Sequence, residues 1–443
     1  MNAVAIDTVW VIFAGCLVLL MQSGFAALEM GLSRMKNAGA VAAKIIVNFA
    51  LAIVVFWAIG YAIAFGDGSG FAGATAWFIE IGNGSGGVAA LQYSGIDEST
   101  KFFFEAMFAA VALAIVWGTM LDRARFIAYL PFAILFVGLI YPVVTHWVWG
   151  GGWLFAHGFQ DFAGSGVVHV TGAFAGIAGA IVVGPRIGKF RSDGSPNPIP
   201  GHSMPLAILG VLILWVGWMG FNAGSFLGAV GKPLGTVIVV TNLAGAFGVL
   251  GAVVVSRLLL GTYDIGMMGN GAIAGLGAIA GPCAFVTPWA GALIGLVAGC
   301  VMVPMVLLVD RMRVDDPIGV LAGHGMGGIV GVLAVGFLTT PEAASSLGGH
   351  AGLFYGGGAT QLGWQALGLL CIASFAFVTG YAAFWLISKT IGLRATEADE
   401  MAGLDIAEHG MFGYPERFIE VIGAEPEDAQ SHVGATMGHA AQG

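Results

Sequence analysis

Charged side chains are scarce in this sequence. Only 9% of the 443 residues are Asp, Glu, Lys or Arg, and 58% are hydrophobic, whereas a soluble domain has about 25% charged and about 45–50% apolar residues. So few polar groups cannot cover a surface in water, which excludes an ordinary soluble enzyme. The same numbers exclude disordered, collagen-like and coiled-coil chains. We expect no nucleic-acid partner.

Cysteine is also rare. Its four residues, Cys16, Cys283, Cys300 and Cys371, are scattered through apolar stretches with no paired spacing. We therefore expect packing roles for them, with neither a disulfide framework nor a metal site, and we predict no cofactor. A cationic leader is missing too, since Asp7 is the only charge before the first apolar run. We expect this first span to remain in the mature protein.

Glycine and long apolar runs are abundant instead. The 73 glycines would weaken helices in water, but in a bilayer small residues let helix backbones approach closely. A membrane-spanning helix needs about 20 mostly apolar residues. Eleven runs qualify, near 8–30, 42–65, 101–121, 126–147, 166–184, 203–223, 235–256, 268–287, 289–309, 318–338 and 363–388. The prediction is an all-α polytopic membrane protein with eleven transmembrane helices.

The basic residues indicate an orientation. Cytoplasmic loops of membrane proteins carry an excess of Lys and Arg. With the N-terminus outside, 14 of the 16 basic residues fall on the cytoplasmic side, and only Lys101 and Lys232 do not. We therefore expect a protein of the inner or plasma membrane, in contact with its lipid, with an external N-terminus and a cytoplasmic C-terminus.

The composition changes near residue 391. Residues 1–390 form the predicted membrane domain, whereas residues 391–443 contain ten acidic and two basic residues. This second region is predicted to be an acidic cytoplasmic tail. We expect about the last 20 residues to be solvated. The stretch 403–410 has a more structured composition, and we expect it to dock on the cytoplasmic face.

Two Asp–His pairs with the same spacing indicate an internal repeat. His169 follows Asp161 by eight residues, and His324 follows Asp316 by eight residues. The histidines fall in the fifth and tenth spans, as a five-plus-five inverted repeat predicts. The predicted parts are repeat one at about 5–190, repeat two at about 200–340, and an extra helix at about 363–388.

A buried histidine pair is a functional candidate, because ionisable residues at bilayer depth are costly. Either histidine alone has a second interpretation, a ring that bonds a backbone carbonyl between packed helices. As a repeat-related pair, His169 and His324 are expected to be neutral, to share a hydrogen bond and to offer an acceptor to a polar solute. Two nitrogens are too few for a metal site. We expect the other seven histidines, His146 among them, at solvated positions.

Aromatic residues gather at the predicted outer ends of three spans. Trp149 ends the fourth span, Phe221 and Ser225 lie four residues apart at the end of the sixth, and Phe104 and Phe108 share one face of the third. Each has an ordinary interpretation as an interfacial belt or as core packing. An indole face also attracts ammonium-type cations. Outer rings above a buried histidine pair would form a selective apolar pore.

Two carboxylates lie near this predicted path. Asp161 precedes the fifth span and either caps it, which we favour, or binds a cation. Glu105 lies one helical turn inside the third span. We expect Glu105 to be a rim charge in a watery vestibule.

Four motifs then occur in a recognisable order. DFAGSGVVH covers residues 161–169, GFNAGS covers 220–225, RVDDP covers 313–317 and GHG covers 323–325. Together they resemble the Amt/Mep/Rh ammonium transporter family over residues 5–415. Trp149 and Ser225 fit the Amt branch. Two residues depart from the family pattern, since Glu105 stands where Gln is common and Asp122 where Glu is frequent.

The resemblance implies a homotrimer with one pore in each subunit. It implies outer recruitment of ammonium by Trp149, Ser225 and Phe108, a gate of stacked rings at Phe108 and Phe221, and a twin-histidine pair at His169 and His324. Asp161 would be the buried acid that supports recruitment, and Phe104 and Glu105 would modify the vestibule. The implied solutes are ammonium and ammonia, with methylammonium left open. A PII-type signal protein is an implied partner at the cytoplasmic face.

Physics constrains the mechanism of such a pore. An ammonium ion at the bilayer centre loses several kcal/mol of hydration even after relaxation, and phenyl rings return no oxygen ligands. We therefore expect ammonium to bind outside, to lose its proton near the gate and to cross as ammonia. If the proton follows along the histidines, uptake is electrogenic, and if it does not, the protein is an electroneutral ammonia channel. The remaining alternatives are an ammonium sensor that signals through the tail and a membrane metalloenzyme. The transporter interpretation, which we favour, makes the protein no enzyme.

Overall fold

The computed structural model describes residues 3–79 and 88–415, and this part of the chain is helices and loops without a β-strand. The α-helices are α1 (Ala3–Leu32), α2 (Ala38–Val55), α3 (Tyr61–Phe65), α4 (Glu98–Gly118), α5 (Phe126–Leu135), α6 (Tyr141–Val148), α7 (Trp153–Ala156), α8 (Thr171–Val183), α9 (Met204–Gly224), α10 (Leu234–Leu260), α11 (Ile265–Ala280), α12 (Pro288–Arg311), α13 (Gly327–Leu338), α14 (Pro341–Leu347), α15 (Thr360–Thr390), α16 (Glu397–Ala402) and α17 (Leu404–His409). Within the described ranges, four π-helical segments interrupt or open helices, η2 (Phe56–Gly60), η4 (Phe136–Ile140), η5 (Ser165–Val170) and η6 (Leu321–Met326).

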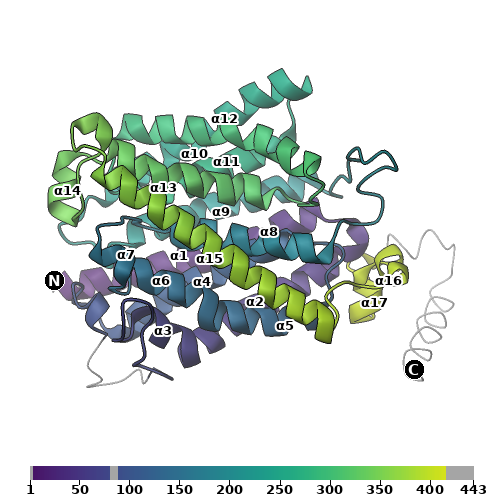
Figure 1. The fold of residues 1–443 in the computed structure, drawn as a ribbon, viewed down its shortest axis with the longest axis horizontal. Coiled ribbons are helices and arrows are strands. Elements are labelled where there is room, and N and C mark those ends of the chain that lie inside the picture. Colours follow the sequence, from purple (N-terminus) through teal and green to yellow (C-terminus); the bar gives the residue numbers. More distant parts are fainter. Residues whose placement is uncertain (1–2, 80–87, 416–443) are drawn as a thin grey trace.

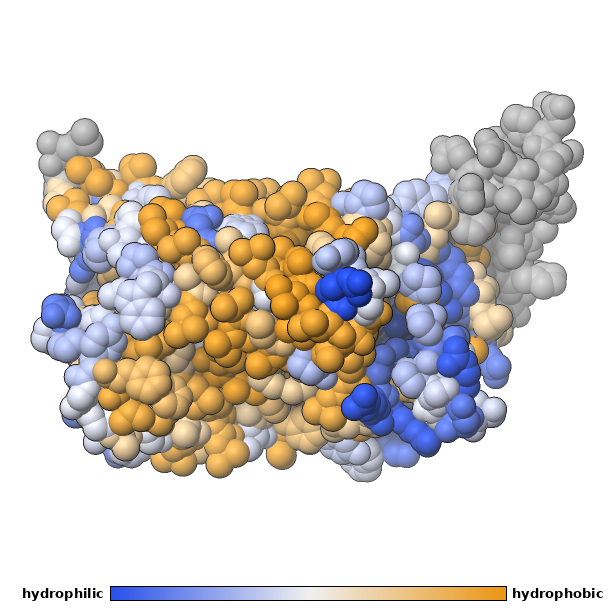
Figure 2. Space-filling view, turned by 90° about the horizontal axis from the view of Figure 1, so that it is seen from above, coloured by the Kyte–Doolittle hydropathy of each residue, from blue (hydrophilic) through white to orange (hydrophobic). Residues whose placement is uncertain are grey.

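The long helices lie roughly side by side along the long axis of the molecule (Figure 1). The start of α1 and α14 lie at one end, called here the N-terminal face, and α16 and α17 lie at the other end, called the C-terminal face. Figure 2 shows a broad hydrophobic belt between these ends and a dense hydrophilic zone at the C-terminal face. Ten helical segments of the described residues are long and apolar enough to cross a membrane. With the shorter α11, they form a multi-pass helical membrane protein.

The predicted spans agree with these helices within a few residues, except at the end of the eighth. That span was expected to reach residue 287, but α11 ends at Ala280. Pro282 has no amide hydrogen and cannot continue a helix. The Ser165 hydroxyl, from η5, also enters the end of α11, where it donates to the Gly277 carbonyl at 2.7 Å and accepts from the Gly281 amide at 2.7 Å. A turn therefore separates α11 from α12.

Glycine lets α1 and α9 pack in direct backbone contact. A Cβ atom added to Gly210 of α9 would lie 2.3 Å from the Leu28 amide nitrogen, and one added to Gly31 of α1 would lie 2.5 Å from the Ala207 nitrogen. Real side chains do not tolerate such distances. Without a hydrophobic force between helices in lipid, this close packing holds them together.

The predicted repeat has a structural counterpart around the two histidines. η5 and η6 are both six-residue π-helical segments, and each contains one histidine of the pair. Asp161 Oδ2 accepts a hydrogen bond from the Gly166 amide at 2.8 Å, and Asp316 Oδ2 accepts one from the Leu321 amide at 2.9 Å. α8 continues from η5 toward the C-terminal face, whereas α13 continues from η6 toward the N-terminal face (Figure 1). The two copies therefore run in opposite directions.

The stretch 403–410, expected to dock on the bundle, packs against the C-terminal face. Asp405 accepts hydrogen bonds from the Ala40 amide at 2.7 Å and the Gly39 amide at 3.1 Å, at the start of α2. Glu408 accepts from the Phe126 amide at 2.8 Å, at the start of α5. Both carboxylates therefore cap helix N-termini, where the free amides and the helix dipole favour negative charge. The expected solvated end of the tail lies outside the described residues.

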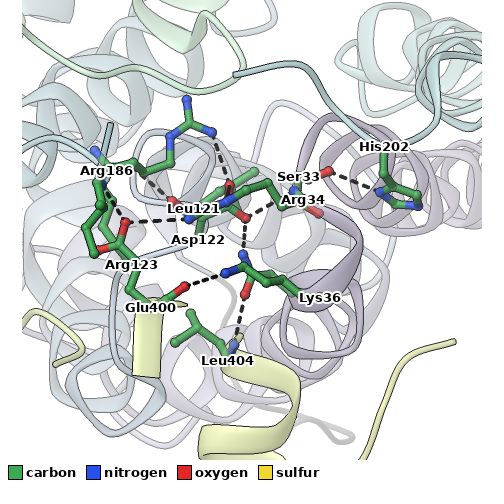
Figure 3. Close-up of polar contacts among 12 residues, drawn as sticks. Ser33, Arg34, Lys36, Leu121, Asp122, Arg123, Arg186, His202, Glu400 and Leu404 are labelled. Atoms are coloured by element: carbon green, nitrogen blue, oxygen red, sulfur yellow. Dashed lines mark hydrogen bonds and ion pairs between the residues drawn. The ribbon is translucent and has the colours of Figure 1, made fainter. Parts of the chain in front are cut away.

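A buried charge network joins this docked segment to the membrane helices (Figure 3). Asp122 pairs with Arg34 at 3.3 Å and with Arg186 at 3.1 Å, and Arg186 also pairs with Asp315 at 2.9 Å. Glu400 of α16 reaches Arg34 at 3.5 Å. Burial alone would raise the pKa of Asp315, but the charge of Arg123 and the hydrogen bonds from Arg186 outweigh it and hold that pKa at about 2. Asp122, the departure noted in the sequence, is thus a central acceptor of this network.

Candidate functional site

His169 and His324 meet in the middle of the bundle. Their Nδ1 atoms lie 3.3 Å apart, and their rings are stacked with centroids 5.2 Å apart. Both are buried, with 0% and 3% of their surfaces exposed. A neutral imidazole carries one N–H, so one Nδ1 must donate to the other in this arrangement. The Nε2 atom of His169 has no hydrogen-bond partner among the described residues, which leaves it available to a solute.

Aromatic rings continue from this pair toward the N-terminal face. The Phe221 ring is stacked on His169 at 5.7 Å between centroids, and Phe108 is stacked on Phe221 at 4.1 Å. Trp149 meets Phe108 edge-on at 6.0 Å. The order Trp149, Phe108, Phe221, His169, His324 forms one continuous line, which we call the ring ladder. Residues from five separate segments of the sequence build it.

The two phenyl rings of the ladder are fully packed against each other. Phe108 is 1% exposed and Phe221 is 0% exposed, and their planes differ by 20°. A solute as large as ammonia cannot pass between rings in van der Waals contact. Conduction along the ladder therefore requires at least one of these rings to move.

The predicted recruitment residues lie at the end of the ladder nearer the N-terminal face. Trp149 and Ser225 are both partly exposed, unlike the rings below them. Trp149 Nε1 donates to the Asp161 backbone carbonyl at 2.6 Å, and Ser225 Oγ donates to the Phe221 carbonyl at 2.8 Å. These bonds fix the indole and the hydroxyl, and they leave the indole face and the lone pairs of Ser225 for a cation.

Asp161 caps η5 and is buried. Its Oδ1 accepts from the Gly164 amide at 3.0 Å, and its Oδ2 accepts from the amides of Gly166 at 2.8 Å and Val167 at 2.9 Å. Three amide donors satisfy the carboxylate within the protein. This geometry is that of a cap, the first of the two interpretations given from the sequence.

Glu105 differs from its sequence interpretation. Its side chain is buried, at 7% exposure, and Oε2 has no hydrogen-bond partner among the described residues. The prediction of a rim charge in a watery vestibule is therefore wrong. Phe104 and Phe108 lie one helical turn apart on α4, and their rings touch at 4.8 Å between centroids. Phe104, one of the two proposed modifiers, therefore contacts the ladder directly.

His146 is a second correction. It was expected at a solvated position, but it is 2% exposed. Its Nδ1 lies 3.0 Å from the Ala64 carbonyl and its Nε2 lies 2.8 Å from the Ser69 carbonyl. The loop after α3 folds over the end of α6 and covers this ring, an arrangement that the position of His146 near a span end does not reveal.

Two rings beside the histidines were missed from the sequence. Trp218 of α9 lies against both, with centroids 5.5 Å from His169 and 6.5 Å from His324. Phe25 of α1 lies 5.9 Å from His324, at the far end of the ladder. Trp218 precedes Phe221 by three residues and shares its helix face, so that spacing was a usable signal. No sequence signal distinguished Phe25 from other core residues.

The described residues contain no group of three or more His, Cys, Asp or Glu side chains able to hold a metal ion.

Comparisons with known proteins agree with one another. The sequence profile of the Ammonium Transporter Family matches residues 9–414. Ammonium transporter Amt2 from Archaeoglobus fulgidus is 40% identical over 430 residues, which cover 93% of this chain and 88% of that protein.

Solved structures with the same fold include one named Sensor Amt Protein, with a TM-score of 0.83 and 35% identity, covering 92% of this chain and 98% of that one. Mep2 from Candida albicans has a TM-score of 0.81 and 28% identity, covering 93% of this chain and 91% of that one. The profile match and the relatives both extend over nearly the whole sequence. The chain therefore belongs to the Ammonium Transporter Family.

Proposed function

We propose that this protein carries ammonium across a membrane along the ring ladder. The family, whose members include named ammonium transporters, supports the solute. The observation that carries the proposal is the unbroken contact from Trp149 through the stacked rings to the histidine pair. The names of the similar proteins describe ammonium transporters, and this argues against the metalloenzyme alternative.

Ammonium is recruited at the outer end of the ladder. The faces of Trp149 and Phe108 attract a cation, by about 0.5–2 kcal/mol for each well-placed ring. Ser225 supplies a hydroxyl oxygen as acceptor. Asp161 supports the site indirectly, because its backbone carbonyl holds the indole of Trp149 at 2.6 Å. Phe104 packs behind Phe108 and modifies the shape of the site.

Below this site the ion gives up its proton. The phenyl rings of Phe108 and Phe221 carry no oxygen to replace water around the ion, so the neutral molecule crosses at far lower cost. We propose that the proton reaches Nε2 of His169, which has no partner among the described residues. It then passes between the two Nδ1 atoms, 3.3 Å apart, to His324. Ammonia moves past the same rings as a separate species.

This path makes uptake electrogenic. One charge crosses for each ammonium taken up, so the membrane potential contributes about 2.3 kcal/mol per 100 mV. The distribution of Lys and Arg supports an N-terminal face directed outward and a C-terminal face directed to the cytoplasm. The ladder then opens at Trp149 to the outside, where ammonium is captured.

The experiment is an ammonium pulse applied to purified protein in proteoliposomes, with current and internal pH recorded together. We expect a saturable current that disappears when His169 and His324 are both replaced by Ala. His350→Ala is the matched control, because this histidine is exposed in the loop after α14. A current unchanged in the double variant would refute the proposed proton path. Internal alkalinisation without any current would favour an electroneutral ammonia channel.

A sensor is the second candidate, because one similar solved structure is named Sensor Amt Protein. The docked α16–α17 segment gives a sensor a means of output, since it caps α2 and α5. Ammonium-dependent protection of this segment in hydrogen exchange, without flux, would favour that function. We also propose, from the family resemblance, a homotrimer and a PII-type partner at the C-terminal face. Light scattering and binding to a purified PII protein test these two points.

A further inference from the structure

The proposed proton path ends at His324, and the side chain that takes the proton next is unassigned. Among the described residues, a buried carboxyl on the C-terminal side has an oxygen without a hydrogen-bond partner. Glu29 of α1 is 1% exposed, and its Oε1 has no hydrogen-bond partner among the described residues. A buried, unpaired carboxyl is costly to keep. A structural role alone does not account for it.

Glu29 lies next to the histidine pair along α1. Phe25, one helical turn earlier, contacts His324 with ring centroids 5.9 Å apart. Residues four apart in a helix share a face and are separated by about 6 Å along the axis. α1 runs from the N-terminal face toward Arg34, which pairs with Asp122 and Glu400 at the C-terminal face. Glu29 is therefore one turn beyond the ladder on the side where the proton must leave.

The same stripe of α1 is polar on both sides of Phe25. Gln22 lies one turn before Phe25 and accepts from Asn48 Nδ2 at 3.2 Å, while its own Nε2 has no partner among the described residues. Asn48 also accepts from the Tyr129 hydroxyl. The stripe Gln22, Phe25 and Glu29 thus borders a polar cluster between α1, α2 and α5, although the surrounding helices are apolar.

The charges that face Glu29 are few. Lys44 of α2 attracts it, but Lys44 Nζ donates to the Ala124 carbonyl at 2.8 Å and forms no ion pair with Glu29 within 4.0 Å. Tyr129 faces it from α5, and His324 faces α1 from η6. α9, on the other side of α1, carries no charged residue between Met204 and Gly224. Glu29 is therefore held near a cation without being fixed by it.

We propose that Glu29 accepts the proton from His324 and releases it to the C-terminal face. In this step the N–H bond of the His324 imidazolium breaks and an O–H bond forms on the Glu29 carboxylate. Phe25 contacts His324 and lies one turn before Glu29, and the proposed step carries the proton between the two groups through water. Glu29 then loses the proton to solvent at the C-terminal face, where it rejoins ammonia. The proposal rests on the proposed function, since it extends the same path by one residue.

The test compares Glu29→Gln and Glu29→Asp with the unmodified full-length protein in proteoliposomes. Glu29→Gln keeps the size and polarity of the side chain but cannot bind the proton. We expect it to lower the ammonium-evoked current at least tenfold, while Glu29→Asp retains current with an altered dependence on the pH at the C-terminal face. Glu397→Gln is the control for losing one negative charge at that face, because Glu397 is exposed on α16. It should leave the current within twofold.

A spectroscopic readout separates proton binding from a structural role. Infrared difference spectra of the unmodified protein, with and without ammonium, should show a change in a protonated carboxyl band that is missing in Glu29→Gln. This measurement also decides the case if Glu29→Gln unfolds, because Glu29→Asp must then shift the band. A Glu29→Gln current within twofold of normal, or an unchanged band, would overturn the proposal.

Failure of this inference is distinct from failure of the proposed function. If the current requires His169 and His324 but survives in Glu29→Gln, only the role of Glu29 is wrong. If the unmodified protein conducts ammonia without current, no proton moves and the role of Glu29 is wrong, although conduction along the ladder stands. If the double histidine variant keeps its current, the proposed path itself is wrong.

Discussion

Asp161 and Asp316 make the same hydrogen bond in the two halves of the protein. Each carboxylate accepts from the amide five residues later, at 2.8 Å and 2.9 Å, and each bond closes the start of a π-helical segment that holds a histidine. A π-helical turn widens a helix and is common at functional sites. The capped segments place His169 and His324 at matching depths from opposite faces. The short distance between the histidines therefore depends on a pair of aspartates that touch neither of them.

Asp315, the neighbour of Asp316 in the sequence, provides a prediction on the stability of the fold. The pKa of Asp315, held at about 2, is below its usual value of 3.8. Its ionised form therefore stabilises the fold above pH 3.8, and this contribution, about 2 kcal/mol, is lost as the pH falls toward 2. Asp315→Asn leaves Asp122 as the remaining buried carboxylate paired with Arg186, and we expect it to lower the free energy of unfolding by roughly 3–5 kcal/mol. Thermal unfolding in detergent at neutral pH measures this loss, and an unchanged midpoint would contradict it.

Asp316 should respond in the opposite way. Burial raises its pKa from 3.8 to about 6, so the protonated form stabilises the fold at low pH, and that contribution is lost as the pH rises through 6. Asp316→Asn keeps an oxygen acceptor for the Leu321 amide but removes the charge. We expect equal or higher stability at neutral pH and a weaker dependence of stability on pH between 4 and 6. If Asp316→Asn lowered the free energy of unfolding as much as Asp315→Asn, the fold would need the charge of Asp316.

The membrane helices were predictable because hydropathy reports burial in lipid directly. Ten spans agreed with the structure, and the end of α11 was missed because two effects coincide there. Pro282 removes one amide, and the Ser165 hydroxyl binds the carbonyl of Gly277 and the amide of Gly281. The contact of Ser165 with α11 joins residues more than 100 positions apart. A pattern within one short stretch of sequence cannot predict it. The π-helical segments were missed for a related reason, since one inserted residue hardly changes the hydropathy of a span.

The site was predictable where residue type and repeat spacing carried the information. The histidines were found in this way and meet in space, whereas the stacking of Phe108 on Phe221 was implied by the family resemblance. Glu105 was misplaced because a carboxylate near a span end is usually solvated, whereas α4 lies inside the bundle with nearly all its residues buried. Glu29 was overlooked for the converse reason. It lies near the end of a span whose outward residues are exposed, and only the tertiary structure shows which face of α1 it occupies.

The α1–α9 contact gives a prediction on packing. Gly210→Ala places a methyl group against the Leu28 backbone, where the distance would be 2.3 Å, so the helices must separate. We expect a cost of about 1–3 kcal/mol, the usual range for overpacking. Gly235→Ala on α10 is the control, because nothing lies within 4 Å of the added carbon. Unfolding in detergent should show a lower midpoint for Gly210→Ala only, and equal midpoints for the two variants would refute the close contact.

The recruitment site gives a prediction on affinity. Ser225→Ala removes the hydroxyl acceptor at the outer end of the ladder but leaves the backbone of α9 intact. A hydrogen bond to a charged group contributes about 1.5–3 kcal/mol, so we expect KM for ammonium to rise about tenfold or more with a smaller change in maximal current. Ser225→Thr, which keeps the hydroxyl, should remain close to the unmodified protein. If KM is the same in all three proteins, Ser225 does not contact the ion.

The docked tail segment gives a prediction on local order. Asp405 accepts from two amides at the start of α2, and loss of an N-cap costs about 0.5–2 kcal/mol. Asp405→Ala should therefore weaken the attachment of α17 more than it weakens the membrane helices. We expect faster hydrogen exchange and faster proteolysis across residues 397–410, with little change in the main unfolding transition. Glu397→Ala is the matched control, since Glu397 is exposed on α16 and its removal leaves both caps in place. Equal exchange in the two variants would mean that α17 is held by Leu404, whose amide donates to Asn37 at 2.8 Å, rather than by the cap.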